Sequence, residues 1–264
     1  MMRVASTDGP ELAVFEWGLG AAPAVVLLHG GGLSSAEWTE IAPALARERR
    51  VIAFDARGCG ASDADPERRY GARTIATDLE TVRSAVALER FALVGHSFGA
   101  VTACVYAAEH PDVVSAVVLL DGGPADHVRP ASLERPPLEF ASRDDAAAAL
   151  ARSLPRGFPD WYLDARFETR PNGRLTWRSD MRGRVQWSRD GGEPLIPGLW
   201  PYVEALRAPT LVLHGEASPL FPRENAVRMT EVNPLVRLLD VPDAGHFVHI
   251  EQPGPVVGAI LEVV

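Results

Sequence analysis

The amino-acid sequence predicts an α/β fold with a mostly parallel sheet, and three observations lead to this prediction. Short apolar runs alternate with segments of helical periodicity, which is typical of parallel strands joined by right-handed crossovers. A Gly-x-Ser-x-Gly motif lies where one such run ends and a helix begins. The alternation breaks between residues 124 and 206 and then resumes. We therefore expect one α/β core, residues 1–123 and 207–264, with a helical cap inserted at 124–206.

Composition limits the class of protein. Of 264 residues 47% are hydrophobic, enough for one large core and a modest insertion. The net charge of −9, without long charged runs, argues against nucleic acid and anionic membranes as partners. All 26 basic residues are arginine. Chemistry that requires a lysine amine, such as Schiff-base formation, pyridoxal phosphate anchoring or a Walker-type phosphate loop, is therefore excluded.

The sequence also indicates where the protein works and with what. Its two cysteines, Cys59 and Cys104, form neither a disulfide framework nor a metal-knuckle spacing. No apolar run reaches the length of a membrane span, and the first residues lack the pattern of a signal peptide. We expect a cytoplasmic protein that acts on a small-molecule substrate without metal, nucleotide or flavin. A homodimer is one option for its assembly.

Each expected element follows from its local pattern. Strands are expected at the apolar runs, namely 11–17, 24–28, 51–54, 91–94, 113–120, 210–214 and 236–241. Helices are expected over 35–47, 74–88, 100–109, 223–230 and from about residue 255 onward. Within 124–206, short helices are expected at 142–150 and 161–169. A structureless loop of this length inside a compact domain is uncommon, so a folded cap is the better interpretation.

The stretch Phe91–Ala100 contains the strongest functional signal. A buried strand, the turn Gly95-His96-Ser97-Phe98-Gly99 and a helix with small residues follow one another directly. This context turns a loose five-residue pattern into a nucleophile elbow, in which a strained turn presents the hydroxyl of Ser97. The alternative interpretation is an ordinary Gly/Ser loop.

Over nearly its whole length the chain resembles the α/β-hydrolase superfamily. The matching motifs are His29-Gly30-Gly31, Asp55-x-Arg57-Gly58-x-Gly60-x-Ser62, the Ser97 elbow and Gly245-His246-Phe247. The resemblance implies an eight-stranded, mostly parallel sheet with helices on both faces and a cap after the sixth strand. It does not fix a substrate, because this fold hosts many chemistries.

The resemblance assigns a base and an oxyanion hole. Ser97 is the expected nucleophile and His246 the expected base, with His249 as a weaker candidate for the base. His96 is expected to be structural. The oxyanion hole is expected from the backbone N–H groups of Phe98 and Gly31, with Gly32 as an alternative donor.

The catalytic acid departs from the pattern of the superfamily. Most members carry an aspartate just after the seventh strand, and that position falls here on Ser218. Two carboxylates are candidates instead. Asp121 ends the sixth strand, where certain dehalogenases and zearalenone-type lactone hydrolases carry their acid, and Glu216 lies nearer the usual place. We favour Asp121 over Glu216, although Asp121 could also be a turn residue.

The resulting hypothesis is a serine hydrolase. It would cleave a carboxylic ester or lactone of a small apolar metabolite through an acyl-Ser97 intermediate. Hydrolysis of a C–C bond, or a biosynthetic cyclisation, on the same residues is an alternative. A non-catalytic ligand-binding relative is another, supported by the missing aspartate. The expected pocket walls are Leu33, Phe98, Trp187, Phe221 and Phe247.

Overall fold

An eight-stranded sheet lies at the centre of this computed structural model, which describes residues 1–18, 20, 22–124, 137–151, 157, 159–183, 196 and 198–264. In spatial order the strands are β1 (Met2–Ala5), β2 (Glu11–Trp17), β4 (Arg50–Phe54), β3 (Ala24–Leu28), β5 (Phe91–His96), β6 (Val114–Leu120), β10 (Thr210–Gly215) and β11 (Val236–Val241). The first three strands pair antiparallel and all other neighbours pair parallel. The predicted mostly parallel, eight-stranded sheet is confirmed.

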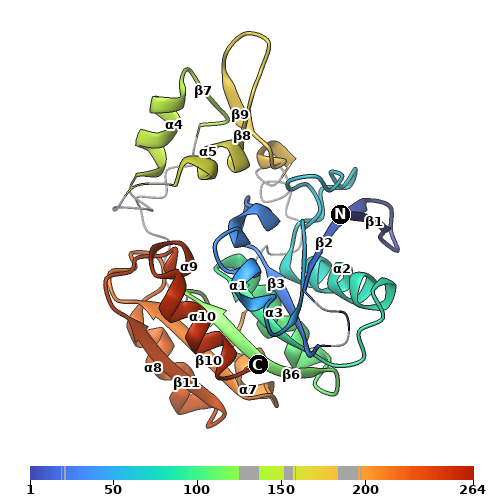
Figure 1. The fold of residues 1–264 in the computed structure, drawn as a ribbon, viewed down its shortest axis with the longest axis vertical. Coiled ribbons are helices and arrows are strands. Elements are labelled where there is room, and N and C mark those ends of the chain that lie inside the picture. The colour runs from blue at the N-terminus through green and yellow to red at the C-terminus, as the bar shows by residue number, and fades with distance from the viewer. Residues whose placement is uncertain are drawn as a thin grey trace.

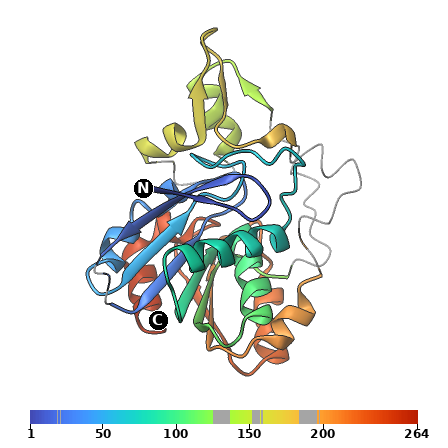
Figure 2. The ribbon, with the colours of Figure 1, turned by 90° about the vertical axis from the view of Figure 1, so that its right-hand side faces the viewer.

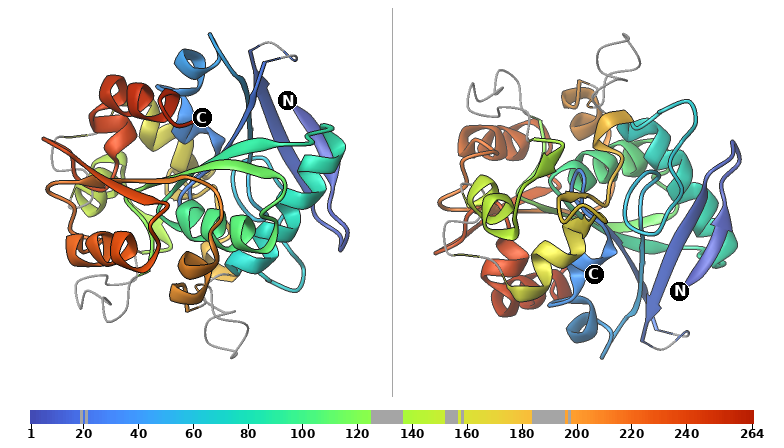
Figure 3. Two further views of the ribbon diagram at one scale, coloured as in Figure 1. Left: turned by 90° about the horizontal axis from the view of Figure 1, so that it is seen from below. Right: turned by 90° about the horizontal axis from the view of Figure 1, so that it is seen from above.

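Helices cover both faces of the sheet, as Figure 3 shows in end view. One apolar cluster joins the sheet to α2 (Ala72–Ala85), α3 (Phe98–Glu109) and α8 (Arg223–Val232). The other joins it to η1 (Ser35–Trp38), α1 (Ala42–Leu45) and α10 (Pro253–Leu261). Alternate residues of a central strand serve the two clusters, as Val26 and Val25 do. The central strands are therefore apolar throughout, which explains why the sequence reveals them so clearly.

Two elements differ from the sequence expectation. The helix expected over 35–47 is divided into η1 and α1, and Pro43 lies in the first turn of α1. Proline favours the start of a helix over its interior because it lacks an N–H group. Strand β1 was not expected, since Val4 is its only buried residue and leaves no apolar run to detect.

The described residues between 137 and 183 form a layer above one end of the sheet (Figures 1 and 2). Helices α4 (Arg143–Leu150) and α5 (Asp160–Arg166) lie in this layer. A small antiparallel sheet lies beside them, in the order β7 (Glu139–Phe140), β9 (Leu175–Trp177) and β8 (Phe167–Thr169). Helix α7 (Trp200–Ala205) lies in the core instead, where Val203 joins the apolar cluster of α3. The expectation of a purely helical cap is therefore incomplete.

The small sheet arises where a single helix was expected over 161–169. Helix α5 ends at Arg166, and β8 and β9 form a hairpin around the turn Pro171-Asn172-Gly173. Gly173 has a φ of +78°, and the side-chain oxygen of Asn172 accepts the N–H of Arg174 at 3.1 Å. These are ordinary turn devices, and the three-residue strands beside them are too short to show alternation.

Polar and aromatic contacts join the cap to the core. The Tyr70 hydroxyl donates to Asp180 Oδ2 at 2.6 Å, and Trp161 Nε1 donates to Glu40 at 2.9 Å. Tyr162 packs edge-on against Phe247, with 5.6 Å between ring centroids. Among the helices described, none is long and apolar enough to cross a membrane.

Candidate active site

Ser97 lies in the sharp turn between β5 and α3. Its φ of 51° and ψ of −112° place it in a region that non-glycine residues rarely adopt. Its backbone N–H donates to Leu120 O at 3.0 Å, which ties the turn to the end of β6. The strained backbone expected for a nucleophile elbow is thus present.

The two glycines of the motif are required by close backbone contacts. A Cβ on Gly99 would lie 1.9 Å from Leu28 O, and one on Gly95 would lie 2.3 Å from Gly99 O. Gly122, after β6, is packed in the same way, because a Cβ there would lie 2.7 Å from Ser97 O. The elbow therefore fits its surroundings only with hydrogen at these positions.

Asp121 and His246 meet at the carboxyl ends of the strands. His246 Nδ1 lies 2.7 Å from Asp121 Oδ2, and the side chains of both residues are buried. Asp121 Oδ1 accepts the N–H of Gly215 at 3.0 Å, so both carboxylate oxygens have a partner. The backbone of Asp121 has a φ of 44° at the point where β6 ends. An imidazole held in this way keeps its Nε2 available as a base.

Ser218 contributes to the same carboxylate. Its hydroxyl donates to Asp121 Oδ2 at 2.5 Å, the same oxygen that faces His246. Glu216, the alternative acid, is exposed, and its backbone N–H donates to Val241 O. The hydrogen bond from Ser218 to Asp121 was not predicted from the sequence, where its only signal is a serine in the loop after β10.

Burial sets the electrostatics of His246. It lowers the pKa of the imidazole, and the charge of nearby His96 acts in the same direction. The hydrogen bond that His246 Nδ1 donates to Asp121 raises the pKa but does not outweigh burial. His246 is therefore neutral at neutral pH, the form that can accept a proton.

His96 and His249, the other two histidines considered for the site, have different surroundings. His96 Nε2 lies 3.0 Å from the backbone oxygen of His246, in line with the structural role expected for it. His249, the alternative base, is fully buried at the start of α9 (Val248–Glu251) and directs its Nε2 to Glu37 at 3.1 Å.

The loop after β3 contains the backbone N–H group of Gly31, one of the two expected hydrogen-bond donors of the oxyanion hole. Gly32 has a φ of +73°, and Leu33 N donates to Gly30 O at 3.1 Å, so the chain folds back at Gly31. The N–H of Gly30 is used internally, since it donates to Glu37 Oε2 at 2.8 Å. Phe98 directly follows Ser97 and is the first residue of α3. These features fit the expected donors, Gly31 and Phe98.

The expected pocket walls have different environments. Leu33 and Phe247 pack into the apolar cluster of the cap, together with Tyr162. Phe98 is half-buried against the cluster of α3, and Phe221 is buried beside Gly123 at the end of β6. Trp187 lies outside the described residues.

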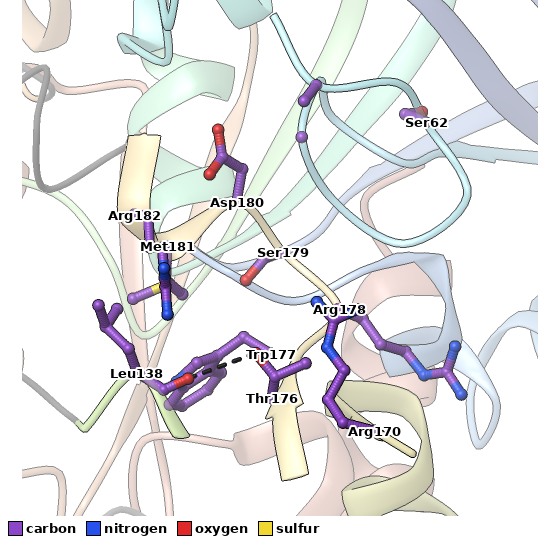
Figure 4. Close-up of a pocket in the computed structure, with 12 residues that line it drawn as sticks. Ser62, Leu138, Arg170, Thr176, Trp177, Arg178, Ser179, Asp180, Met181 and Arg182 are labelled. Carbon is purple, nitrogen blue, oxygen red and sulfur yellow. Dashed lines mark hydrogen bonds between the residues drawn. The ribbon is translucent and has the colours of Figure 1, made fainter. Parts of the chain in front are cut away.

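A cavity of about 320 Å³ opens between the cap and the loop after β4 (Figure 4). Its wall includes Ser179 and Met181, which would lie 3.5 and 3.3 Å from a Cβ on Gly32. The cavity therefore adjoins the loop after β3 that contains residues 30–32, called the oxyanion loop below after its expected role. Neither Ser97 nor His246 is among the described residues that line the cavity. Its lining combines apolar side chains with the arginines 170, 178 and 182.

The remaining motif residues brace the loop after β4. Asp55 accepts the N–H groups of Ser35 and Ala61 at 2.6 and 2.8 Å. Arg57 is fully buried and forms ion pairs with Asp65 and Asp78 at 2.6 Å. Neither residue contacts the elbow through these bonds, so their role in the structure is to brace this loop.

One group among the described residues has the composition of a metal site. Glu37, His96 and His249 are buried, with potential ligand atoms all within 4.8 Å of one another. Glu37 Oε1 faces His96 Nδ1 and lies 3.1 Å from His249 Nε2, so the carboxylate contacts both imidazoles directly.

Comparison with known proteins places this site in a family. Residues 23–253 match the family described as alpha/beta hydrolase fold, so the chain belongs to the α/β-hydrolase fold family. A Bacillus subtilis (strain 168) protein described as a candidate 2-succinyl-6-hydroxy-2,4-cyclohexadiene-1-carboxylate synthase is 31% identical over 96% of this chain and 94% of its own length.

Further relatives have several activities. The 2-hydroxy-6-oxo-6-(2'-aminophenyl)hexa-2,4-dienoic acid hydrolase of Metapseudomonas resinovorans is 28% identical over 98% of this chain and 89% of its own. Esterase Rv0045c of Mycobacterium tuberculosis (strain ATCC 25618 / H37Rv) is 28% identical over 99% of this chain and 88% of its own length. The crystal structure of E-2-(acetamidomethylene)succinate hydrolase superposes with a TM-score of 0.84, at 26% identity over 99% and 97% of the chains. Relatives named as hydrolases indicate an enzyme.

Proposed function

We propose that this protein is a serine hydrolase that cleaves a carboxylic ester or lactone through an acyl-Ser97 intermediate. The observation that supports this most directly is the Asp121–His246 contact of 2.7 Å at the carboxyl ends of the strands, on the edge of the sheet that also carries the strained Ser97 turn. His246 takes the proton of Ser97 as the hydroxyl attacks the acyl carbon. The N–H groups of Phe98 and Gly31 receive the negative charge that develops on the carbonyl oxygen.

The second half of the reaction uses the same residues. His246, now protonated and stabilised by Asp121, gives its proton to the leaving alcohol. Water then enters, His246 removes a proton from it, and the hydroxide attacks the acyl group. The C–O bond to Ser97 breaks, and the proton returns to the Ser97 oxygen.

A second candidate reaction is hydrolysis of a C–C bond in a substrate that carries a carboxylate. Two observations favour it. Arginines 170, 178 and 182 line the cavity beside the oxyanion loop. Two relatives that align with nearly the whole chain are named after carboxylic acids, one as the synthase of a carboxylate and one as the hydrolase of a dienoic acid.

A fluorophosphonate probe tests the first proposal. We expect it to label the wild-type protein at one site, identified as Ser97 by peptide mass spectrometry, and to leave Ser97→Ala unlabelled. An unlabelled wild-type protein would favour the ligand-binding alternative. Rates on matched neutral esters, carboxylate-bearing esters and vinylogous diketones then separate the two candidate reactions, because only C–C hydrolysis consumes the diketones.

A further inference from the structure

A buried carboxylate lies behind the candidate active site and contacts three of its segments. Glu37, on η1, is 2% exposed. Its Oε2 accepts the N–H of Gly30 at 2.8 Å, in the oxyanion loop. Its Oε1 faces His96 Nδ1, in the elbow. The same oxygen lies 3.1 Å from Nε2 of His249, just after residues 242–247, the loop that contains His246 and is called the base loop below. No part of the proposed mechanism uses this group directly.

The groups that contact His96 determine which of its two ring nitrogens carry a proton. Its Nε2 lies 3.0 Å from the backbone oxygen of His246, and a carbonyl oxygen can only accept, so Nε2 carries a proton. Its Nδ1 faces Glu37 Oε1. If Glu37 is ionised, Nδ1 must carry a proton too, and the ring is an imidazolium. If Glu37 is protonated, the ring is neutral.

The environment of Glu37 favours the ionised form. Burial alone raises the pKa of this carboxyl, but the charges and hydrogen bonds of His96 and His249 outweigh burial and hold the pKa well below its usual range. In geometric terms, one buried carboxylate faces Nδ1 of His96 and also accepts a backbone N–H. A charge pair with this many donors can persist without water.

We propose that Glu37 is a positioning residue: its carboxylate, paired with an imidazolium His96, holds the oxyanion loop and the base loop in register for turnover. The link to the base loop runs through His96, which donates to the backbone of His246. The ring centroids of His96 and His246 are 4.6 Å apart. This inference rests on the proposed function, since it assumes that Gly31 and His246 act as described there.

The first test measures protons and needs no substrate. Nitrogen-15 NMR of histidine-labelled wild-type protein at pH 7, with His96 assigned from its substitution by Gln, reports the protonation of each ring nitrogen. We expect both nitrogens of His96 to be protonated. A singly protonated His96 would overturn the charge pair. A divalent metal retained by the purified protein at one equivalent and lost in Glu37→Gln would also overturn it, because ligand nitrogens are unprotonated.

The second test is kinetic. Glu37→Gln keeps the shape of the side chain and removes its charge. We expect kcat on p-nitrophenyl acetate to fall about 10- to 100-fold, the scale of a small misplacement of catalytic groups, while KM changes less than about threefold. Glu37→Asp, which restores the charge on a shorter side chain, should recover part of kcat.

Asp78→Asn is the matched control for the kinetic test. It also removes a buried carboxylate from an ion pair, but the partner is Arg57, away from the elbow. Both variants should lower the melting temperature, and only Glu37→Gln should lower kcat. Unchanged kcat in a folded Glu37→Gln protein would refute the proposal, and if that variant does not fold, the NMR result decides. Failure of the proposed function would appear separately, as absent labelling of Ser97 in the wild type.

Discussion

Asp121 is the residue that we propose as the acid of the site. Its carboxylate has three partners, the His246 ring, the Gly215 N–H and the Ser218 hydroxyl. Three donors leave the carboxylate little freedom to rotate. This arrangement supports the proposal that Asp121, rather than a residue after β10, orients His246.

Asp121→Asn should abolish most activity while preserving the fold. The amide keeps the shape but cannot stabilise the imidazolium form of His246, and the comparable change in a serine protease costs about 10⁴-fold in turnover. Glu216→Gln is the matched control and should remain near wild type, because Glu216 is exposed. Ester hydrolysis by the two purified variants is the measurement, and an Asp121→Asn enzyme of near-normal rate would remove Asp121 from the mechanism.

The pH dependence follows from the buried state of His246. Because burial lowers the pKa of this imidazole, the acid limb of kcat/KM should have its midpoint below the ordinary histidine value of about 6.5. The unfolded chain binds the proton more readily, so the contribution of His246 to the free energy of unfolding is complete above about pH 6.5 and falls as pH drops toward the folded pKa. A pH–rate profile with its midpoint above 6.5 would contradict this assignment.

At the scale of elements, the elbow is a junction of β3, β5 and α3. Gly95 and Gly99 allow backbone atoms of these elements to approach within distances that a methyl group would prevent. The motif is thus a packing requirement as well as a means of presenting Ser97.

Gly99→Ala should destabilise the protein strongly, because its Cβ would lie 1.9 Å from Leu28 O and the backbone would have to move. Gly258→Ala is the control. Gly258 lies within α10, and a Cβ there meets nothing within 4 Å. Its replacement should stabilise the helix by roughly 0.5–1 kcal/mol. Thermal unfolding measures both, and equal melting temperatures for the two variants would show that the elbow tolerates a side chain.

At the scale of the whole molecule, the cap is positioned by a few contacts on the core. Tyr70 to Asp180 is one of them, and Asp180 N also donates to Gly58 O at 2.7 Å. Both Gly58 and Asp180 line the cavity of Figure 4. The shape of this cavity therefore depends on how the cap is held.

Tyr70→Phe should loosen the cap without altering the triad. We expect KM for a bulky ester to rise several-fold, while acylation by p-nitrophenyl acetate stays within about twofold. Loss of the hydrogen bond should reduce the free energy of unfolding by about 1 kcal/mol. Tyr202→Phe, which removes a hydroxyl bonded to Arg73 at the surface, is the control. An equal effect of both variants on KM would argue against a role for cap docking in substrate binding.

Some features of the fold and of the site could be predicted from the sequence and others could not, for physical reasons. The central strands and the elbow were predictable because burial on both faces requires continuous apolar runs and because Gly95 and Gly99 mark the turn. The hairpin of β8 and β9 was not, since three-residue strands carry almost no periodicity. The contact of Ser218 with Asp121 and the cluster around Glu37 are tertiary contacts between loops that lie far apart in the sequence. The spacing of residues along the chain does not reveal such contacts.

The triad as a unit is the central claim, and the non-additivity of substitutions tests it most directly. Ester hydrolysis should be measured for Ser97→Ala, His246→Ala and the double variant, each checked for folding by circular dichroism. Each single change should reduce kcat by about 10³-fold or more, and the double variant should be little worse than either, because residues that act together lose their function together. Activity within about tenfold of wild type in folded Ser97→Ala, or losses that multiply in the double variant, would contradict the account.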